Sequence, residues 1–231
     1  MTSQGPEDAP VPLEMTPDEL LATTRSVRRR LDLERPVERS VVETCLDLAL
    51  QAPNGSNLQR WQWVVVDDPA AIGKIAGLYN EALAGYAAEV NRGEVQGYEP
   101  RNVPGMDRMT ESVMHLAQHL HRIPLLVVPC FAGRMEGASV FEQASLWGSI
   151  LPAAWSLMLA LRSRGLGSAW TTVHLHRERE VARVLDIPFE SHTQAGLFPV
   201  AWTRGTGFRR APRKPLESVL HWNRWRGESR P

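Results

Sequence analysis

Two basic clusters, far apart in the sequence, contain the residue types that bind phosphate. The first lies near the N-terminus and comprises Arg25, Ser26 and Arg28. Guanidinium groups bind phosphate oxygens with paired hydrogen bonds, and a hydroxyl adds a further donor. A spacing of about three residues predicts that Arg25 and Arg28 lie on one side of a helical turn. The second cluster, Arg213 and Lys214, lies near the C-terminus and could complete the same site. Each cluster alone is also compatible with a solvated basic surface, because arginines at helix ends complement the helix dipole.

A polar loop contains the residue types that recognise a flat heterocycle. It comprises Pro53, Asn54, Gly55 and Asn57, between a predicted helix and a predicted strand. Carboxamide groups and exposed backbone amides can both donate and accept hydrogen bonds. Such a loop could read a ring edge with alternating donors and acceptors. The alternative is an ordinary turn in which Asn and Gly adopt positive φ.

A glycine-rich corner forms a third candidate. It runs from residue 165 to residue 172 and includes Gly167, Trp170, Thr171 and Thr172. A dinucleotide fingerprint would follow a strand and open a helix, whereas this segment follows a predicted helix and opens a predicted strand. The corner therefore indicates free amides and hydroxyls at a tight turn, and not a Rossmann site.

Other familiar catalytic motifs are missing from the sequence. His174 and His176 form an HxH pair, but no Cys, Asp or His cluster stands nearby to complete a metal shell. The sequence contains no GxSxG, HExxH or Walker motif. We therefore expect neither a metal site nor a common hydrolase or nucleoside triphosphatase site.

The periodicity of apolar residues predicts the elements that must position these candidates. Thr16, Pro17 and Glu19 predict the start of a first helix that ends near Thr24. The other predicted helices span residues 36–52, 69–91, 141–164 and 177–185, and the predicted strands span residues 61–66, 124–131, 168–173 and 195–203. This order favours an α+β domain with an antiparallel or mixed sheet flanked by helices over strict βαβ alternation.

Three segments lie outside this regular pattern. Residues 1–14 are predicted to be a disordered tail that precedes one domain, residues 15–231. Residues 92–108 are rich in Gly and Pro and long for a loop, which makes them a candidate lid or an arm to a partner. Residues 203–231 form a basic, Trp-containing extension with no core of its own. The run 141–164 is too uniformly apolar for a surface helix, and we expect it to be the central buried helix.

Composition excludes several classes of protein. Lys plus Arg and Asp plus Glu both number 26, so no global positive field attracts nucleic acid or anionic membranes. Cys45 and Cys130 are far apart and are expected to be buried thiols. The N-terminus lacks the features of a signal peptide. We expect no apolar run to reach the roughly 20 residues of a membrane span. The expected location is the cytoplasm.

The chain resembles the FMN-dependent nitroreductase family in four segments and in their order: the two basic clusters, the polar loop and the glycine-rich corner. The basic N-terminal cluster is similar to that family's arginine-serine phosphate motif, and APNGSNLQRW at residues 52–61 is similar to its APSGxNxQPW segment. The corner resembles its GLG segment, and RKPL at residues 213–216 resembles its C-terminal motif. The resemblance covers the chain from about Thr16 to Trp225. Departures from the pattern are Thr24 in place of arginine, Asn54 in place of serine and Arg60 in place of proline.

The resemblance implies a role for each cluster. Arg25, Ser26 and Arg28 would contact the phosphate of FMN, with Arg213 and Lys214 joining them. The loop residues Pro53, Asn54, Gly55 and Asn57 would line the flavin bound to the partner subunit. The corner residues Gly167, Trp170, Thr171 and Thr172 would lie near flavin N5 and O4.

The resemblance also implies an activity and an assembly. The protein would be a homodimer with FMN at the subunit interface and with the C-terminal extension wrapped around the partner. NAD(P)H would donate a hydride to flavin N5, and a nitroaromatic, quinone or similar small acceptor would then replace the nucleotide. Dehalogenation, enone reduction and flavin breakdown are alternative reactions for the same fold, and a non-catalytic flavin-binding or storage protein is the alternative from another class.

Overall fold

The computed structural model describes residues 12–95 and 105–225 of the chain. The helices are α1 (Pro17–Thr23), α2 (Arg39–Ala49), α3 (Pro69–Arg92), α4 (Met106–His119), α5 (Val140–Ser163) and α6 (Glu178–Val184). The strands are β1 (Trp61–Val66), β2 (Leu125–Ala132), β3 (Leu166–Ser168), β4 (His192–Gln194) and β5 (Phe198–Trp202). Short 3-10 helices include η1 (Gly55–Asn57), η3 (Leu120–Arg122), η4 (Val173–Arg177) and η5 (Leu216–Ser218).

The strands form one antiparallel sheet built around β2. Strand order is β1-β2-β5-β3, and β4 pairs with the end of β2. In the register, Trp61 of β1 faces Phe131 of β2, and Leu125 of β2 faces Val200 of β5. The predicted α+β class is therefore confirmed, with a wholly antiparallel sheet among the described residues.

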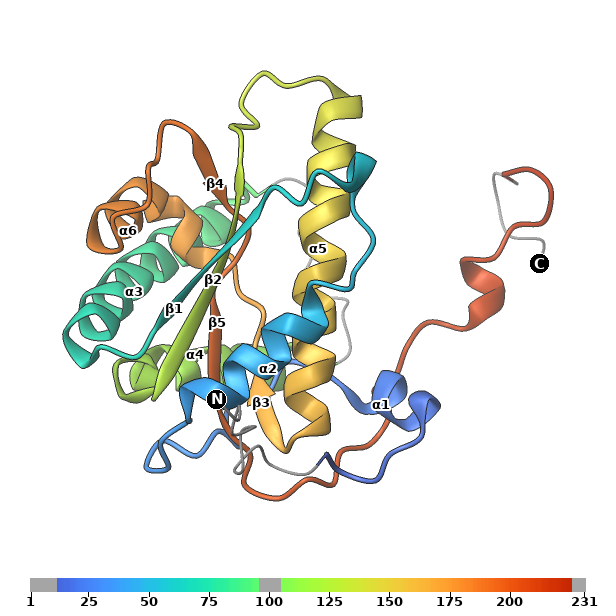
Figure 1. The fold of residues 1–231 in the computed structure, drawn as a ribbon, viewed down its shortest axis with the longest axis horizontal. Helices are drawn as coiled ribbons and strands as arrows, with labels where there is room; N and C mark the ends of the chain where they lie inside the picture. The colour runs from blue at the N-terminus through green and yellow to red at the C-terminus, as the bar shows by residue number, and fades with distance from the viewer. Residues whose placement is uncertain (1–11, 96–104, 226–231) are drawn as a thin grey trace, which may run out of the picture.

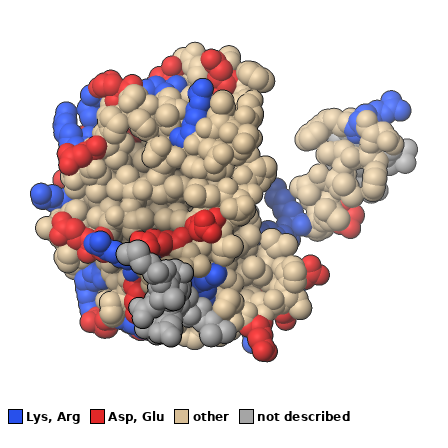
Figure 2. Space-filling view, in the orientation of Figure 1, with Lys and Arg blue, Asp and Glu red and all other residues tan. Residues whose placement is uncertain are grey.

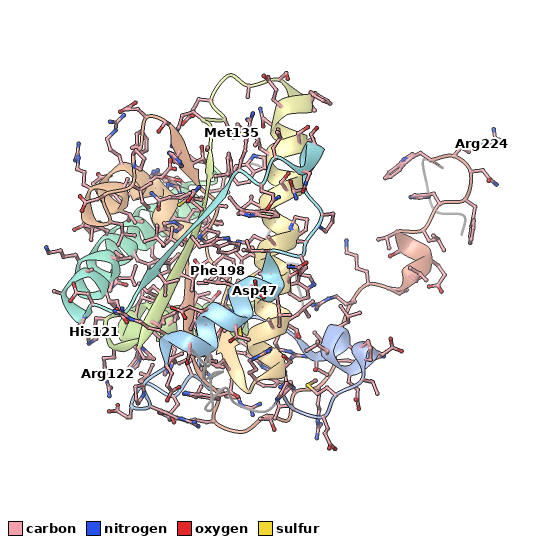
Figure 3. All side chains as sticks on the ribbon, in the orientation of Figure 1. Asp47, His121, Arg122, Met135, Phe198 and Arg224 are labelled. Atoms are coloured by element: carbon pink, nitrogen blue, oxygen red, sulfur yellow. The ribbon has the colours of Figure 1, made fainter. Side chains whose placement is uncertain are left out.

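Helices cover both faces of this sheet (Figure 1). Along β2, Leu125 and Val127 point into a core shared with α2 and α5. Leu126 and Val128 point into the opposite core, which α3, α4 and α6 complete. Successive strand side chains face opposite sides of a sheet. The continuous apolar strand β2 therefore contributes side chains to both cores. Phe198 of β5 lies near the centre of the molecule (Figure 3).

Capping residues set the helix boundaries near their predicted positions. Thr16 and Glu19 form the expected reciprocal capping box, with Pro17 in the first turn of α1. Asp68 accepts hydrogen bonds from the first amides of α3, and Gly93 ends that helix with φ of 72°. Left-handed backbone at such a helix end favours glycine. The ends of α1 and α3 therefore confirm the boundaries expected from local sequence.

Helix α5 is only partly the buried central helix that its composition predicts. From Ile150 onward most of its residues are buried against the sheet and α2, whereas Val140 and Phe141 at its start are 84% and 79% exposed. The expectation that no apolar run reaches membrane-span length was wrong, because the length and composition of α5 would be sufficient to cross a membrane. Its second half nevertheless packs in the protein core.

Several predicted elements differ from the structure. The second helix begins at Arg39 and not at Pro36. The strand predicted over residues 168–173 is displaced to residues 166–168, and the two histidines 174 and 176 lie in η4. Strand β4 and helix α4 were missed. Helix α4 covers the end of the predicted irregular segment 92–108, and residues 96–104 of that segment lie outside the described residues.

The start of the C-terminal extension is anchored to the body. The Arg30 guanidinium donates to the carbonyl oxygens of Arg204 and Gly207 at 3.0 and 2.8 Å. The Phe208 ring centroid lies 4.2 Å from the Arg30 guanidinium and 4.8 Å from that of Arg162. Beyond this clamp of Phe208 by the two arginines, the chain passes the cavity lined by Arg210 and Arg213 and then leaves the body as an arm, with Arg224 far from the core (Figures 1 and 3).

Both cysteines are buried thiols, as expected. Cys45 lies on α2 and Cys130 on β2, in different cores. Burial raises the pKa of Cys45 to about 11 and that of Cys130 to about 12. Because the thiolate is the reactive form, neither side chain is a nucleophile near neutral pH.

Gly167 of β3 lies where there is no room for a side chain. A Cβ atom at this position would lie 2.7 Å from Thr203 Cγ2 and 3.0 Å from both Leu31 Cδ2 and Val27 Cβ. Three side chains, two on the segment 27–31 and one that follows β5, would have to move to accommodate it. The position therefore fixes how closely residues 27–31 approach β3.

We expect Gly167→Ala to lower the free energy of unfolding by about 1–3 kcal/mol, because it overpacks a filled core. Urea unfolding followed by circular dichroism measures the change. The matched control is Gly77→Ala on the exposed face of α3, where a Cβ meets nothing within 4 Å. That control should raise stability by up to about 1 kcal/mol, since Ala is the better helix former. Equal stability of the two variants would contradict the packing argument.

Candidate flavin site

The basic N-terminal segment is extended and lies beside β3. After α1, Thr24 adopts β-region backbone with φ of −67° and ψ of 133°. The Val27 amide donates to Ser168 O at 2.8 Å, and the Trp170 amide donates to Ser26 Oγ at 3.3 Å. The expected helical turn is therefore wrong, because the backbone of this segment is used for pairing with the corner. The structure does bring two of the predicted site segments together.

Arg25 faces a basic cavity of about 750 Å³. Arg210 and Arg213, from the C-terminal extension, line the same cavity, with Asp18 and Trp155 on other walls. Figure 2 shows basic side chains gathered where the arm leaves the body. The predicted convergence of Arg25 with Arg213 is thus observed, whereas Lys214 does not line this cavity.

The chemistry of the cavity fits an anionic phosphate. The Nε and Nη2 atoms of Arg25 are buried and make no hydrogen bond within the described part of the chain. In the described ranges of the chain, Arg213 donates only to the neighbouring carbonyl of Pro212, at 3.0 Å. Buried guanidinium donors without acceptors are costly. Phosphate oxygens would supply the missing acceptors.

Arg28 points elsewhere and does not line the Arg25 cavity. Its Nη1 donates to Ser112 Oγ on α4 at 3.4 Å, and its Nε is buried without a hydrogen-bond partner in residues 12–95 and 105–225. Burial lowers the pKa of Arg28, and the interaction with Tyr79 opposes that change. Arg28 therefore places a positive charge beside the corner instead of beside Arg25.

The loop between α2 and β1 has an unusual backbone. Ser56, Asn57 and Gln59 have φ of 52°, 54° and 47°. The turn alternative expected positive φ at Asn and Gly, and Asn57 has it, whereas Gly55 does not. The Gly55 amide instead donates to Ser149 Oγ on α5 at 2.9 Å. Positive φ at non-glycine residues is energetically unfavourable and clusters at functional sites.

Side chains of the loop hold this conformation. The Gln59 amide donates to Asn54 Oδ1 at 3.0 Å, and Gln59 Nε2 donates to Asn57 Oδ1 at 3.3 Å. On one side Asn54 and Gly55 line a cavity of about 340 Å³. On the other, Pro53 and Asn57 line one of about 580 Å³. Neither cavity shares a lining residue with the Arg25 cavity.

The corner residues after β3 are held by backbone pairing. Thr171 forms an isolated bridge with Leu197, in which the Thr171 amide donates to Leu197 O at 3.1 Å and Thr171 O accepts from the Leu197 amide at 2.8 Å. The Trp170 ring packs against Phe198, with centroids 5.1 Å apart. The amides of Trp170 and Thr171 are therefore occupied. The Thr171 hydroxyl lies 3.1 Å from the Tyr79 hydroxyl, and Thr172 is exposed.

The sequence analysis did not identify some residues of this region as parts of a candidate site. Arg210 carries no motif signal apart from its place in a basic stretch before Arg213. Tyr79 contacts Thr171 and lies on α3, where the apolar periodicity indicates only packing. Ser112 contacts Arg28 and lies on α4, a helix that was not predicted. No group of three or more potential metal-ligating side chains occurs among the described residues.

Solved structures of flavoproteins have a similar fold. Iodotyrosine deiodinase bound to FMN and 3-iodo-L-tyrosine matches with a TM-score of 0.63 and 21% identity over 87% of this chain and 96% of that one. A BluB-like flavoprotein from Clostridium difficile 630 matches with a TM-score of 0.65 and 17% identity over 91% and 100%. An FMN- and NADPH-dependent nitroreductase, NfnB from Sphigopyxis sp. strain HMH, matches with a TM-score of 0.62 and 20% identity over 91% and 100%.

A comparison with curated proteins finds no significant match to the chain. The model of the nitroreductase family, by contrast, matches residues 21–202. This range contains the basic segment, the polar loop, the whole sheet and the corner. The chain belongs to the nitroreductase family.

Proposed function

We propose that this protein is an FMN-dependent NAD(P)H oxidoreductase. The observation that carries the proposal is that Nε and Nη2 of Arg25 are buried without an acceptor in the described residues, in a side chain that shares a cavity with Arg213. The neighbouring Ser26 accepts a hydrogen bond from Trp170 of the corner. Similar folds bind FMN, and the similar NfnB uses NADPH. Bound FMN would accept a hydride from NAD(P)H and pass it to a nitroaromatic, quinone or similar acceptor.

The side chains have separate parts in this proposal. Arg25, Ser26, Arg210 and Arg213 would bind and orient the phosphate. Arg28 would keep positive charge near the ring, where negative charge increases on reduction. The corner would set the distance between the ring and the nucleotide, since hydride transfer needs reacting atoms about 3–3.5 Å apart. No protein nucleophile is needed.

We also propose a homodimer, because the loop and the basic segment line separate cavities within one chain. Apolar surface suited to a second copy is available. The start of α5 exposes Val140 and Phe141, and the arm exposes Leu216, Val219, Leu220, Trp222 and Trp225. Large exposed apolar groups favour burial against a partner. The arm of one subunit would pack on the other and bring the two halves of each flavin site together.

The purified protein should be yellow and contain one FMN for each chain. Stopped-flow mixing with NADH or NADPH should bleach the flavin absorbance, and a nitroaromatic or quinone should restore it. Bound FMN that neither nucleotide reduces would refute the reductase proposal and favour dehalogenation, enone reduction, flavin breakdown or storage. A chain that binds no FMN would refute the cofactor assignment itself.

Arg25→Gln and Arg213→Gln should each raise the dissociation constant for FMN about tenfold or more, since a hydrogen bond to a charged group contributes about 1.5–3 kcal/mol. Fluorescence titration of the apoprotein measures both constants. Affinity for riboflavin, which lacks the phosphate, should not change. Arg209→Gln is the matched control, because Arg209 lies in the same basic stretch but outside the cavity. Equal losses for FMN and riboflavin would contradict a phosphate contact.

Replacing Trp222 and Trp225 together by Ser should shift sedimentation toward the monomer and lower flavin occupancy in parallel, because the arm loses its largest apolar contacts. Analytical ultracentrifugation over a dilution series gives the association constant. Arg224→Ala, between the two tryptophans, should leave association unchanged. An unchanged dimer in the double variant would show that the arm does not hold the subunits together.

A further inference from the structure

The cavity of about 340 Å³ lies between the polar loop, the end of β2 and the first half of α5. Its inner wall consists of Trp61, Phe131 and Ile150, which are 8%, 1% and 1% exposed. The partly buried side chains of Met135 and Leu146 continue this apolar surface. The wall is therefore formed by one chain alone. A cavity of this size with aromatic side chains in its wall suits a small, flat aromatic ligand.

Two charged side chains that line this cavity, Glu142 and Arg134, already have partners. The Glu142 carboxylate accepts hydrogen bonds from the amide and the hydroxyl of Ser139 at 2.9 and 2.7 Å, in the capping box of α5. Its negative charge is complemented there by the positive N-terminal end of the helix. Arg134 forms ion pairs with Glu136 and Glu178, of which the pair with Glu178 is largely buried. Neither Glu142 nor Arg134 is therefore the group that would select a charged ligand.

Arg60 is the third charged residue of the cavity wall, and its guanidinium has no hydrogen-bond or ion-pair partner in the part of the chain that the structure describes. The main chain holds this residue in place, because the Ala132 amide donates to Arg60 O at 3.0 Å. The preceding Gln59 has a φ of 47°, and its amide donates to Asn54 Oδ1 at 3.0 Å. Positive φ at a non-glycine residue is unfavourable and clusters at functional sites. The strained loop thus keeps an unpaired positive charge at the exposed edge of an apolar cavity.

We propose that this cavity binds a small aromatic carboxylate, with the ring against Trp61 and Phe131 and the carboxylate on the Arg60 guanidinium. An arginine binds a carboxylate through two parallel hydrogen bonds, and burial of the ring against the apolar wall adds affinity. Ser56 and Ser145 also line the cavity, and their hydroxyls can donate to the same ligand. Binding at this site goes beyond the proposed function, because it requires neither FMN nor the nucleotide.

Calorimetric titration of the purified protein with 2-naphthoate tests the site. The uncharged analogue 2-naphthamide should bind about tenfold more weakly, because it lacks the charge-assisted hydrogen bonds. Arg60→Gln should raise the dissociation constant for 2-naphthoate about tenfold and leave that for 2-naphthamide nearly unchanged. Ala138→Phe, which adds a ring to the cavity wall, should weaken the binding of both ligands. Removal of the flavin should leave all four results the same.

The matched control is Arg108→Gln, an exposed position on α4 outside this cavity, which should leave both dissociation constants unchanged. Equal affinities for 2-naphthoate and 2-naphthamide, or tighter binding of 2-naphthylmethylammonium, would overturn the assignment of Arg60. Absence of binding, or binding that disappears when the flavin is removed, would overturn the site itself. FMN binding and reduction by NAD(P)H, which test the proposed function, do not depend on this result.

Discussion

The candidate site depends on the pairing between the basic segment and β3. The hydrogen bond from the Val27 amide to Ser168 O holds that segment against the sheet. Because Gly167 has no side chain, Val27 and Leu31 can pack directly over the strand. Ser26 then accepts a hydrogen bond from the Trp170 amide. One close backbone contact therefore positions both the phosphate donors and the corner, although they are separated by more than half the chain.

The sequence identifies most of this architecture where the signals are long or strongly local. The limits of β1 match the prediction, and those of α3 and α5 lie within one residue of it, because each element has a clear apolar pattern and turn residues at its ends. Strand β4 has only three residues, too few for a periodic signal. Thr171 and Thr172 suggested a strand because they are β-branched. They lie instead at a corner where Thr171 makes a single bridge.

The candidate site is recognisable in the sequence by residue type, but its geometry is not. Arg25 and Arg213 converge as expected, whereas Arg28 faces Tyr79 and Ser112 because the segment is extended. Tyr79 follows the apolar pattern of α3, and nothing in that pattern distinguishes a tyrosine that only fills the core from one that contacts a corner threonine. Such contacts are formed by tertiary packing, and they cannot be predicted from the pattern of a single sequence.

The clamp at Phe208 has a consequence for how subunits would meet. The guanidinium groups of Arg30 and Arg162 both contact the ring of this residue, and these contacts hold the start of the C-terminal extension on the body. Only the chain beyond the cavity-lining residue Arg213 would then have to lose conformational freedom when a second copy arrives, and this limits the entropic penalty of association. An arm that starts from a held position on the body could pack on a partner without any rearrangement of the cavity residues beside its root.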